Sequence, residues 1–395
     1  MKFGIEELPK NMKDVKIVIG ANYGDEGKGL MTRHFVLDAK VKDMNPIVIF
    51  SNGTAQRGHT VDYSADSRHV YHHFGSGTGD KAPTYFAKTF LIHPMEYHRE
   101  YNELISQGIT PPLSYFDADA KVITPFDMVV DHATEEWIAI ENGEREFGSC
   151  GFGSWCAAED RIPMGRTAYT ITDFMNFTAV PFLLEEIWKD CLAILAIRKV
   201  DLEKTSFAHL LKDRTVVINN FINDLKFFFK HSRMISFEGL FNHSVFDSFI
   251  FENGQGLGLD MNVKNNWHTT SNTGVINPYD LLWDKNDFSA EVCYVTRSYL
   301  TRHGVGPLEE IVQKKEINSE MHDKTNIHND FQGSLRYGYL EDIDQQERIR
   351  NDFANVLFDP RFNYSMAVTH INEFDCGLDN TKYYSDNPFG VRERR

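Results

Sequence analysis

The sequence has few cysteines, and they follow no pairing pattern. Five cysteines are scattered over 395 residues, an odd number without a Cys-x-x-Cys pair. A disulfide-based scaffold would need an even set of cysteines at short spacings, and a zinc ribbon would need paired ones. Neither is expected here, and a reducing cytosol is the predicted compartment.

Positive charge and long apolar runs are also scarce. The formal net charge is -16 at pH 7, so no global positive field exists to attract nucleic acid or an anionic membrane. No run approaches the roughly 18 to 20 apolar residues of a membrane span, and the first residues lack the pattern of a signal peptide. We expect a cytoplasmic protein that contacts neither nucleic acid nor membrane and holds phosphate by local groups.

The composition itself is that of a well-packed globular protein, with 42% hydrophobic and 13% aromatic residues. Residues 15–19 form a short apolar run typical of a buried strand, residues 30–39 have helical spacing, and residues 46–50 resemble a second buried strand. This βαβ pattern predicts an α/β fold with a large, mostly parallel central sheet and flanking helices. Ligands then lie at the carboxyl ends of the strands.

The rest of the chain adds two strands and a helical segment. Strands are predicted at residues 249–251 and 366–369, the first followed by a glycine turn at residues 252–256. Residues from about 175 to 235 have long helical periodicity with few turn signals, which indicates a helical insertion. No internal repeat is evident. We therefore predict one domain over residues 1–395.

The glycine-rich segment GDEGKG, residues 24–29, lies directly between the first strand and the first helix. Its glycines let backbone amides approach an anion, the helix N-terminus favours negative charge, and Lys28 adds a positive charge. Gly29 stands where a Walker A loop has Ser or Thr, so a P-loop kinase or GTPase is not expected. Asp25 would repel phosphate unless it binds Mg²⁺ or takes a proton, which favours catalysis over a merely tight turn.

Other motifs could carry chemistry, each beside a plainer alternative. His59, in the string GHT, has a reference pKa suited to a general acid, although a lone His is more often an ordinary loop residue. Residues 148–153 form a second glycine-rich loop or a simple connector. Gln255 could bond a base edge, and the hydroxyl run at residues 269–273 could contact phosphate, but both could be polar turns.

The order and spacing of these motifs resemble the adenylosuccinate synthetase family. The GDEGKG string is highly specific, and the resemblance runs from about residue 15 to the end, thinnest between about 170 and 245 and in the C-terminal third. It implies a C–N ligase that joins L-aspartate to C6 of a 6-oxopurine nucleotide through a 6-phosphoryl intermediate. A nucleoside triphosphate is the phosphoryl donor, Mg²⁺ the cofactor, and a homodimer the expected assembly.

The resemblance also implies roles for single residues. Asp25 would take the purine N1 proton and bind Mg²⁺ with Gly58, His59 would assist departure of the diphosphate, and Gln255 would fix the purine. The implied triphosphate-binding residues are Gly24, Glu26, Gly27, Lys28, Gly29, Gly58, Thr60, His370, Asn372 and Pro388. The implied monophosphate-binding residues are Gln56, Ser149, Cys150, Arg166 (donated across the dimer), Gln255 and Thr269, and the aspartate-binding residues are Thr301, Arg302 and Arg336.

Several positions depart from the family around the purine nucleotide and aspartate. Gln56-Arg57 replaces Asn-Ala before GHT, which is expected to alter the pocket near the purine nucleotide. Cys150 is a weak hydrogen-bond donor at a phosphate-binding position. His303 replaces Val after Thr-Arg, and Arg336 is the arginine that obviously remains in a reduced aspartate loop. The substrate is therefore expected to differ from that of the common enzyme.

The triphosphate site departs as well, because His370-Ile371-Asn372 replaces a Lys-x-Asp whose Asp reads guanine donors. Asn itself offers donors, so guanine would be poorly read and ATP or dATP is favoured. With the short chain and an FQGxxRxG loop, this looks like the phage 2-aminodeoxyadenylosuccinate synthetases, which act on dGMP with ATP or dATP and supply 2-aminoadenine for phage DNA. A phage-encoded enzyme would work in the host cytoplasm.

The acceptor stays open between two readings. The best-known phage enzymes lack the carboxylate that Asp25 supplies, because a guanine 2-amino group crowds N1. We favour dGMP or GMP with ATP or dATP, with IMP and GTP as the first alternative. A non-catalytic nucleotide-binding regulator on the same scaffold is the second.

Overall fold

The structure is a computed structural model that describes most of the chain. The described residues are 12–143, 151–154, 156–157, 169–243, 245–263, 272–304, 306–308, 311–319, 334–340, 342–374, 376–377 and 381–394. Four predicted binding residues, Ser149, Cys150, Arg166 and Thr269, lie outside them.

A ten-stranded sheet forms the centre of the fold. Its described strands pair in parallel except at one edge, where β16 and β17 are antiparallel. In spatial order they are β17 (Arg392–Glu393), β16 (Tyr383–Tyr384), β15 (Phe362–Thr369), β11 (Phe288–Arg297), β1 (Lys13–Gly20), β10 (Ser248–Gly256), β2 (Pro46–Phe50), β5 (Thr84–Phe86), β7 (Ser114–Phe116) and β9 (Ser232–Met234). The predicted α/β class with a large, mostly parallel sheet is confirmed.

The predicted βαβ unit is present, with a third strand inserted in it. β1, α1 (Lys28–Val41) and β2 follow one another along the chain, but β10 lies between the two strands and pairs with both. The predicted turn at residues 252–256 is wrong, because β10 continues to Gly256. Glu252 and Gln255 therefore belong to the carboxyl end of a central strand.

Alternate side chains of the central strands enter two separate hydrophobic cores. On β1, Val15, Ile17 and Ile19 pack in one core and Val18 in the other. Residues 47–50 of β2 alternate in the same way. A parallel strand that is buried on both faces needs apolar side chains in both directions, which explains the continuous apolar runs in the sequence.

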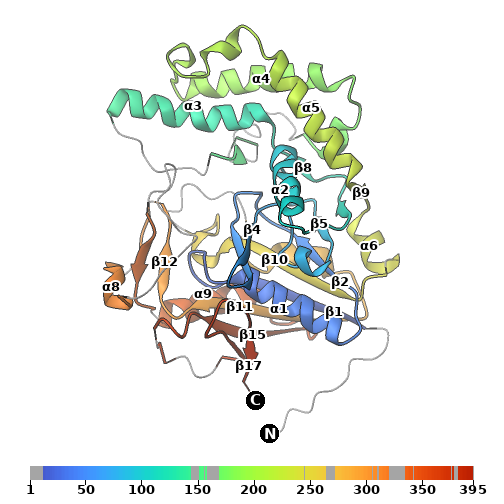
Figure 1. Cartoon of the computed structure of the whole chain (residues 1–395), viewed down its shortest axis with the longest axis vertical. Coiled ribbons are helices and arrows are strands. Elements are labelled where there is room, and N and C mark those ends of the chain that lie inside the picture. Colours follow the sequence, from blue (N-terminus) through green and yellow to red (C-terminus); the bar gives the residue numbers. More distant parts are fainter. Residues whose placement is uncertain are drawn as a thin grey trace.

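Helices cover both faces of the sheet. One core includes residues of α1, α2 (Pro94–Ser106), α3 (Pro125–Asn142), α4 (Val180–Ile197) and α5 (Thr215–Lys230), and the other includes residues of α6 (Phe237–His243), α7 (Ile276–Leu282) and α9 (Asp342–Phe353). α3, α4 and α5 gather at one end of the molecule (Figure 1). α4 and α5 account for the predicted helical segment, and α3, which precedes it, packs against α4.

Three smaller sheets accompany the central sheet in the described part of the chain. β3 (His59–Ser64) and β4 (Ser67–Tyr71) form a hairpin, and β6 (Leu91–Ile92) pairs with β8 (Lys121–Val122). β14 (Arg336–Gly338) lies between β12 (Leu300–Arg302) and β13 (Ile311–Val312), next to the short helix α8 (Lys314–Ile317). Within the described part of the chain, no helix is both long and apolar enough to cross a membrane.

Candidate active site

A cavity of about 320 Å³ opens at the carboxyl edge of the sheet. The loop between β1 and α1, the start of β3, and the residues that follow β15 all contribute to its walls. Of the residues singled out in the sequence, the cavity is lined by Asp25, Glu26, Gly27, Lys28, Gly29, Gly58, His59, Thr60, His370, Asn372 and Pro388. All the predicted triphosphate-binding residues except Gly24 therefore lie around one space, together with Asp25 and His59.

The glycine-rich loop is braced from within by Glu26. Its Oε1 accepts hydrogen bonds from the backbone N–H groups of Asn22 and Gly24, both at 2.9 Å, and its Oε2 lies 3.0 Å from Nζ of Lys28. The side chains of Glu26 and Lys28 are each only 2% exposed. A Cβ on Gly256 would lie 2.7 Å from Oε1 of Glu26, so glycine is needed there. Lys28 is thus held by a carboxylate inside the loop, and Gly27 and Gly29 line the cavity beside it.

Gly29 explains why this loop cannot be a Walker A loop. It is the second residue of α1, and a Cβ there would lie 2.8 Å from the carbonyl oxygen of Thr60 and 3.1 Å from the carbonyl carbon of His59. A Ser or Thr side chain has no room, because the start of β3 packs directly on the first turn of the helix. The hydroxyl that a Walker A loop directs at Mg²⁺ is excluded by packing.

We expect Gly29→Ser to lower the free energy of unfolding by about 1–3 kcal/mol, the usual cost of overpacking, and to weaken ATP binding by displacing His59 and Thr60. Urea titration and calorimetric titration with ATP measure the two effects. The matched control is Gly390→Ser, because a Cβ on Gly390 meets nothing within 4 Å. Unchanged stability and ATP affinity in Gly29→Ser would contradict this packing argument.

Asp25 has a left-handed backbone conformation, with φ of 58°. Such a conformation is uncommon for a residue with a side chain and needs support from its surroundings. Nε of Arg297 donates a hydrogen bond to the carbonyl oxygen of Asp25, and Oδ2 of Asp25 lies 3.3 Å from Nε2 of His303. Arg297, at the end of β11, also lines the cavity. The sequence analysis did not identify Arg297 as a site residue, although the apolar run before it predicts a strand.

His59 is held by a buried carboxylate from β10. Nδ1 of His59 donates to Oε1 of Glu252 over 2.6 Å, and Glu252 is fully buried. Burial lowers the pKa of His59 to about 4, and the Glu252 carboxylate opposes that shift. A neutral ring that donates through Nδ1 carries no proton on Nε2, so His59 must first gain a proton before it can donate to a leaving phosphate, a step that the Glu252 carboxylate favours. No local sequence motif marks Glu252 as the partner of His59.

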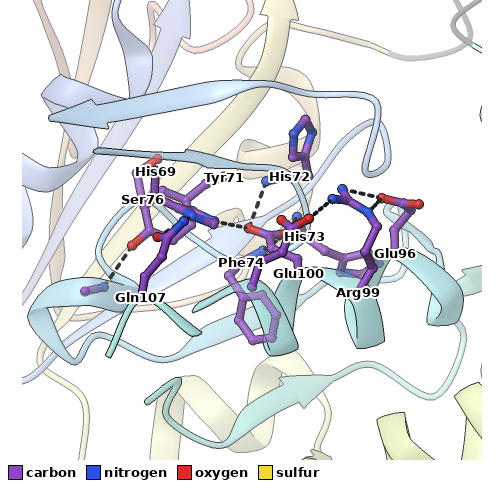
Figure 2. A network of polar contacts seen from close by, with 12 residues as sticks. His69, Tyr71, His72, His73, Phe74, Ser76, Glu96, Arg99, Glu100 and Gln107 are labelled. Carbon is purple, nitrogen blue, oxygen red and sulfur yellow. Dashed lines mark hydrogen bonds and ion pairs between the residues drawn. The ribbon is translucent and has the colours of Figure 1, made fainter. Parts of the chain in front are cut away.

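The second support of Glu252 comes from Ser76, whose backbone N–H donates to Oε2 over 2.9 Å and whose hydroxyl donates to Oε1. The turn before Ser76 is fixed by Glu100 of α2, as Figure 2 shows. This buried carboxylate accepts from the backbone N–H groups of His72, at 3.0 Å, and of His73 and Phe74. Contacts therefore run from Glu100 of α2 through residues 72–76 and Glu252 to His59. No local sequence motif predicts this series of contacts.

The predicted purine-binding residues that can be described lie outside the cavity lining. Gln255 has a φ of 62° at the end of β10. Oε1 of Gln56 accepts from the hydroxyl of Ser154 at 3.0 Å, so Gln56 contacts the end of the second glycine-rich loop. Arg57, the neighbour of Gln56, does not line the cavity. Its guanidinium is buried over the ring of Phe50, at 3.8 Å, and donates to backbone carbonyl groups.

The predicted aspartate-binding residues come together in the small sheet, where Thr301 and Arg302 of β12 pair with Tyr337 and Arg336 of β14. Arg302 packs over the ring of Tyr23, 5.0 Å from its centroid. They lie apart from the cavity lining, and Tyr23 connects them to the glycine-rich loop.

Comparison with known sequences gives a consistent result. The family profile described as adenylosuccinate synthetase matches residues 17–347. The adenylosuccinate synthetase of Tropheryma whipplei (strain Twist) is 27% identical over 301 residues, which is 74% of this chain and 63% of that protein. The enzyme of Clostridium botulinum (strain Eklund 17B / Type B) is 24% identical over 299 residues, covering 74% and 64%. The chain thus matches less than two thirds of the length of these relatives.

Two solved structures share the fold. Fully ligated adenylosuccinate synthetase from Plasmodium falciparum superimposes with a TM-score of 0.66 and 16% identity, over 93% of this chain and 78% of that one. The succinoaminodeoxyadenylate synthetase of cyanophage S-2L, bound to dGMP and to dATP as an energy donor, gives a TM-score of 0.61 and 14% identity, over 97% and 95%.

Proposed function

The chain belongs to the adenylosuccinate synthetase family, and on that premise we propose that it is a ligase that condenses L-aspartate with C6 of a 6-oxopurine nucleotide. The observation that carries the proposal is the shared cavity of Asp25, Lys28 and His59. A proton acceptor, a cation held in an amide-rich loop and a buried imidazole are the groups that phosphoryl transfer to an oxygen of the base requires.

The reaction has two bond-forming steps. In the first, Asp25 takes the proton from purine N1 while O6 attacks the γ-phosphorus, and the nucleoside diphosphate leaves with assistance from His59. In the second, the amino nitrogen of L-aspartate attacks C6, and the 6-phosphoryl group leaves as phosphate. Arg302 and Arg336 bind the carboxylates of aspartate, and Gln255 fixes the base. Glu252 keeps the ring of His59 oriented.

Mg²⁺ is the expected cofactor, and the residues present suit it. Asp25 and Gly58 both line the cavity, and a carboxylate and a carbonyl are the oxygen ligands that Mg²⁺ prefers. When bound, the ion would neutralise the charge that develops on the phosphates. The other carboxylate of the loop, Glu26, is engaged by two backbone amides and Lys28, so Asp25 is the loop carboxylate that would hold the ion.

We favour dGMP or GMP as the acceptor and ATP or dATP as the donor, giving 2-amino-(deoxy)adenylosuccinate. His370 and Asn372 line the cavity where the family carries Lys-x-Asp, and an Asn in place of the Asp removes the acceptor pair that reads guanine. The cyanophage relative was solved with dGMP and dATP. Retention of Asp25 favours the alternative, in which IMP is the acceptor and GTP the donor. A homodimer in which Arg166 reaches the partner's monophosphate site completes the proposal.

The test is phosphate release with Mg²⁺ and L-aspartate, crossing IMP, GMP and dGMP with ATP, dATP and GTP. We expect activity with dGMP or GMP and an adenine triphosphate, and mass spectrometry should show an aspartate adduct of the purine. Activity confined to IMP with GTP would identify an ordinary adenylosuccinate synthetase. Triphosphate binding without turnover under all nine conditions would instead support a nucleotide-binding regulator and overturn the ligase proposal.

A further inference from the structure

His303 contacts the carboxylate that the proposed reaction uses as its base. Nε2 of His303 lies 3.3 Å from Oδ2 of Asp25, with the two side chains 18% and 23% exposed. A carboxylate oxygen accepts and does not donate when ionised, so the ring nitrogen in this contact carries the hydrogen. The contact joins two positions 278 residues apart in the sequence and lies beside the cavity that Asp25 lines.

The backbone around His303 is fixed by the two arginines of the small sheet. Nη1 of Arg302 donates to the carbonyl oxygen of Pro307 at 2.9 Å, and Nη2 of Arg336 donates to the carbonyl oxygen of Gly304 at 2.7 Å. Both arginines are therefore tied to the segment that directly flanks His303. Bonds to carbonyl groups on the C-terminal side of His303 restrain the backbone from which the imidazole extends, which suits it to hold another group in place.

Asp25 needs such support because its backbone is strained and its side chain is short. Arg297 fixes the main chain through the carbonyl oxygen, but that bond leaves the orientation of the carboxylate undetermined. His303 supplies the missing constraint by engaging Oδ2, and Oδ1 can then face the purine. A base misplaced by about 1 Å can lose about 100-fold in rate, so this orientation matters.

We propose that His303 is a positioning residue for the ligase reaction: it orients the Asp25 carboxylate toward the purine N1–H and couples that base to the segment that carries Arg302 and Arg336. The inference rests on the proposed function, since it takes Asp25 as the base. Loss of the His303 side chain should therefore lower kcat and leave the affinity for the triphosphate almost unchanged. We also expect binding of aspartate at the arginines to influence the orientation of Asp25.

The experiment compares wild type, His303→Leu and His303→Gln under the most active substrate combination. His303→Leu removes both ring nitrogens at similar volume, whereas His303→Gln keeps an amide N–H donor that can reach Asp25. We expect kcat to fall about 10- to 100-fold in His303→Leu, with the KM for the triphosphate within twofold of wild type. His303→Gln should recover kcat to within about threefold. Crystal structures should show the Asp25 carboxylate rotated only in His303→Leu.

A matched control exists between α2 and α5, where Nδ1 of His98 pairs with Oδ1 of Asp224 at 2.7 Å. His98→Leu removes a His–carboxylate contact of comparable exposure and should leave kcat within twofold of wild type. If His303→Leu keeps full kcat, or if His303→Leu and His303→Gln lose activity and thermal stability equally, the positioning role is refuted. A wild-type enzyme without ligation activity would overturn the proposed function and this inference together.

Discussion

Asp25→Asn is expected to lower kcat by at least about 1000-fold while the affinity for the triphosphate stays within a few-fold of wild type. Loss of a general base typically costs about 100- to 10,000-fold, and this change also weakens the proposed Mg²⁺ site. Asn has nearly the same shape and tolerates the left-handed conformation that Asp25 adopts at φ 58°. The fold and the amide groups of the loop are therefore expected to persist. Single-turnover kinetics and calorimetric titration with ATP measure the two quantities separately.

The control for Asp25→Asn is Asp38→Asn, on the exposed side of α1, where Asp38 pairs with Lys42 at 2.6 Å. This change makes the same chemical substitution on the helix that follows the loop of Asp25, and it should leave kcat unaltered because exposed ion pairs contribute little. Turnover of Asp25→Asn near that of wild type would remove Asp25 from the role of base. Loss of triphosphate binding in parallel with turnover would reassign it to nucleotide binding.

His59→Asn should slow phosphoryl transfer by about 100- to 10,000-fold, the range for a lost general acid. Asn can keep the hydrogen bond to Glu252 through its amide N–H, so the buried carboxylate is not left without a donor. Glu252→Gln, measured alongside, retains His59 but changes the partner that fixes its ring, and a smaller loss of rate is expected. Rapid-quench measurement of the first turnover isolates this step from later ones.

His209, an exposed histidine beside the carbonyl oxygen of Ser206, offers the comparison for this variant. His209→Asn should behave as wild type. A rate for His59→Asn within about fivefold of wild type would return His59 to a purely structural role on β3. Equal losses for His59→Asn and Glu252→Gln with lowered thermal stability would indicate that the buried pair supports the fold rather than the reaction.

Much of the fold and part of the site could be predicted because the signals are local. The apolar runs at residues 15–19, interrupted by Lys16, and at residues 46–50 become β1 and β2, since strands buried on both faces are mostly apolar. The GDEGKG segment lies between β1 and α1 as expected. A glycine loop at a helix start carries its amide groups and positive end with it, so its anion-binding character does not depend on distant residues.

The partners of the site residues depend on contacts between distant parts of the chain. The order of strands in the sheet, with β10 between β1 and β2, brings Glu252 against His59 across 193 residues. Arg57 is buried, with its guanidinium over the ring of Phe50 and donating to the carbonyl oxygen of Glu252. No periodicity or motif encodes such pairings. They form only when the folded sheet brings the carboxyl ends of strands that are distant in sequence to one edge.

The sequence by itself therefore determined the class of fold and the family, and it singled out the residues that we propose hold phosphate. The tertiary structure decided which of them share one cavity, how Glu252 and Ser76 orient His59, and that His303 contacts Asp25. Short local motifs determine which chemical groups a site contains, through residue type and backbone conformation. Orientation within a site is determined by side chains that are distant in sequence, and only the packing of the sheet and its loops places them within hydrogen-bonding distance.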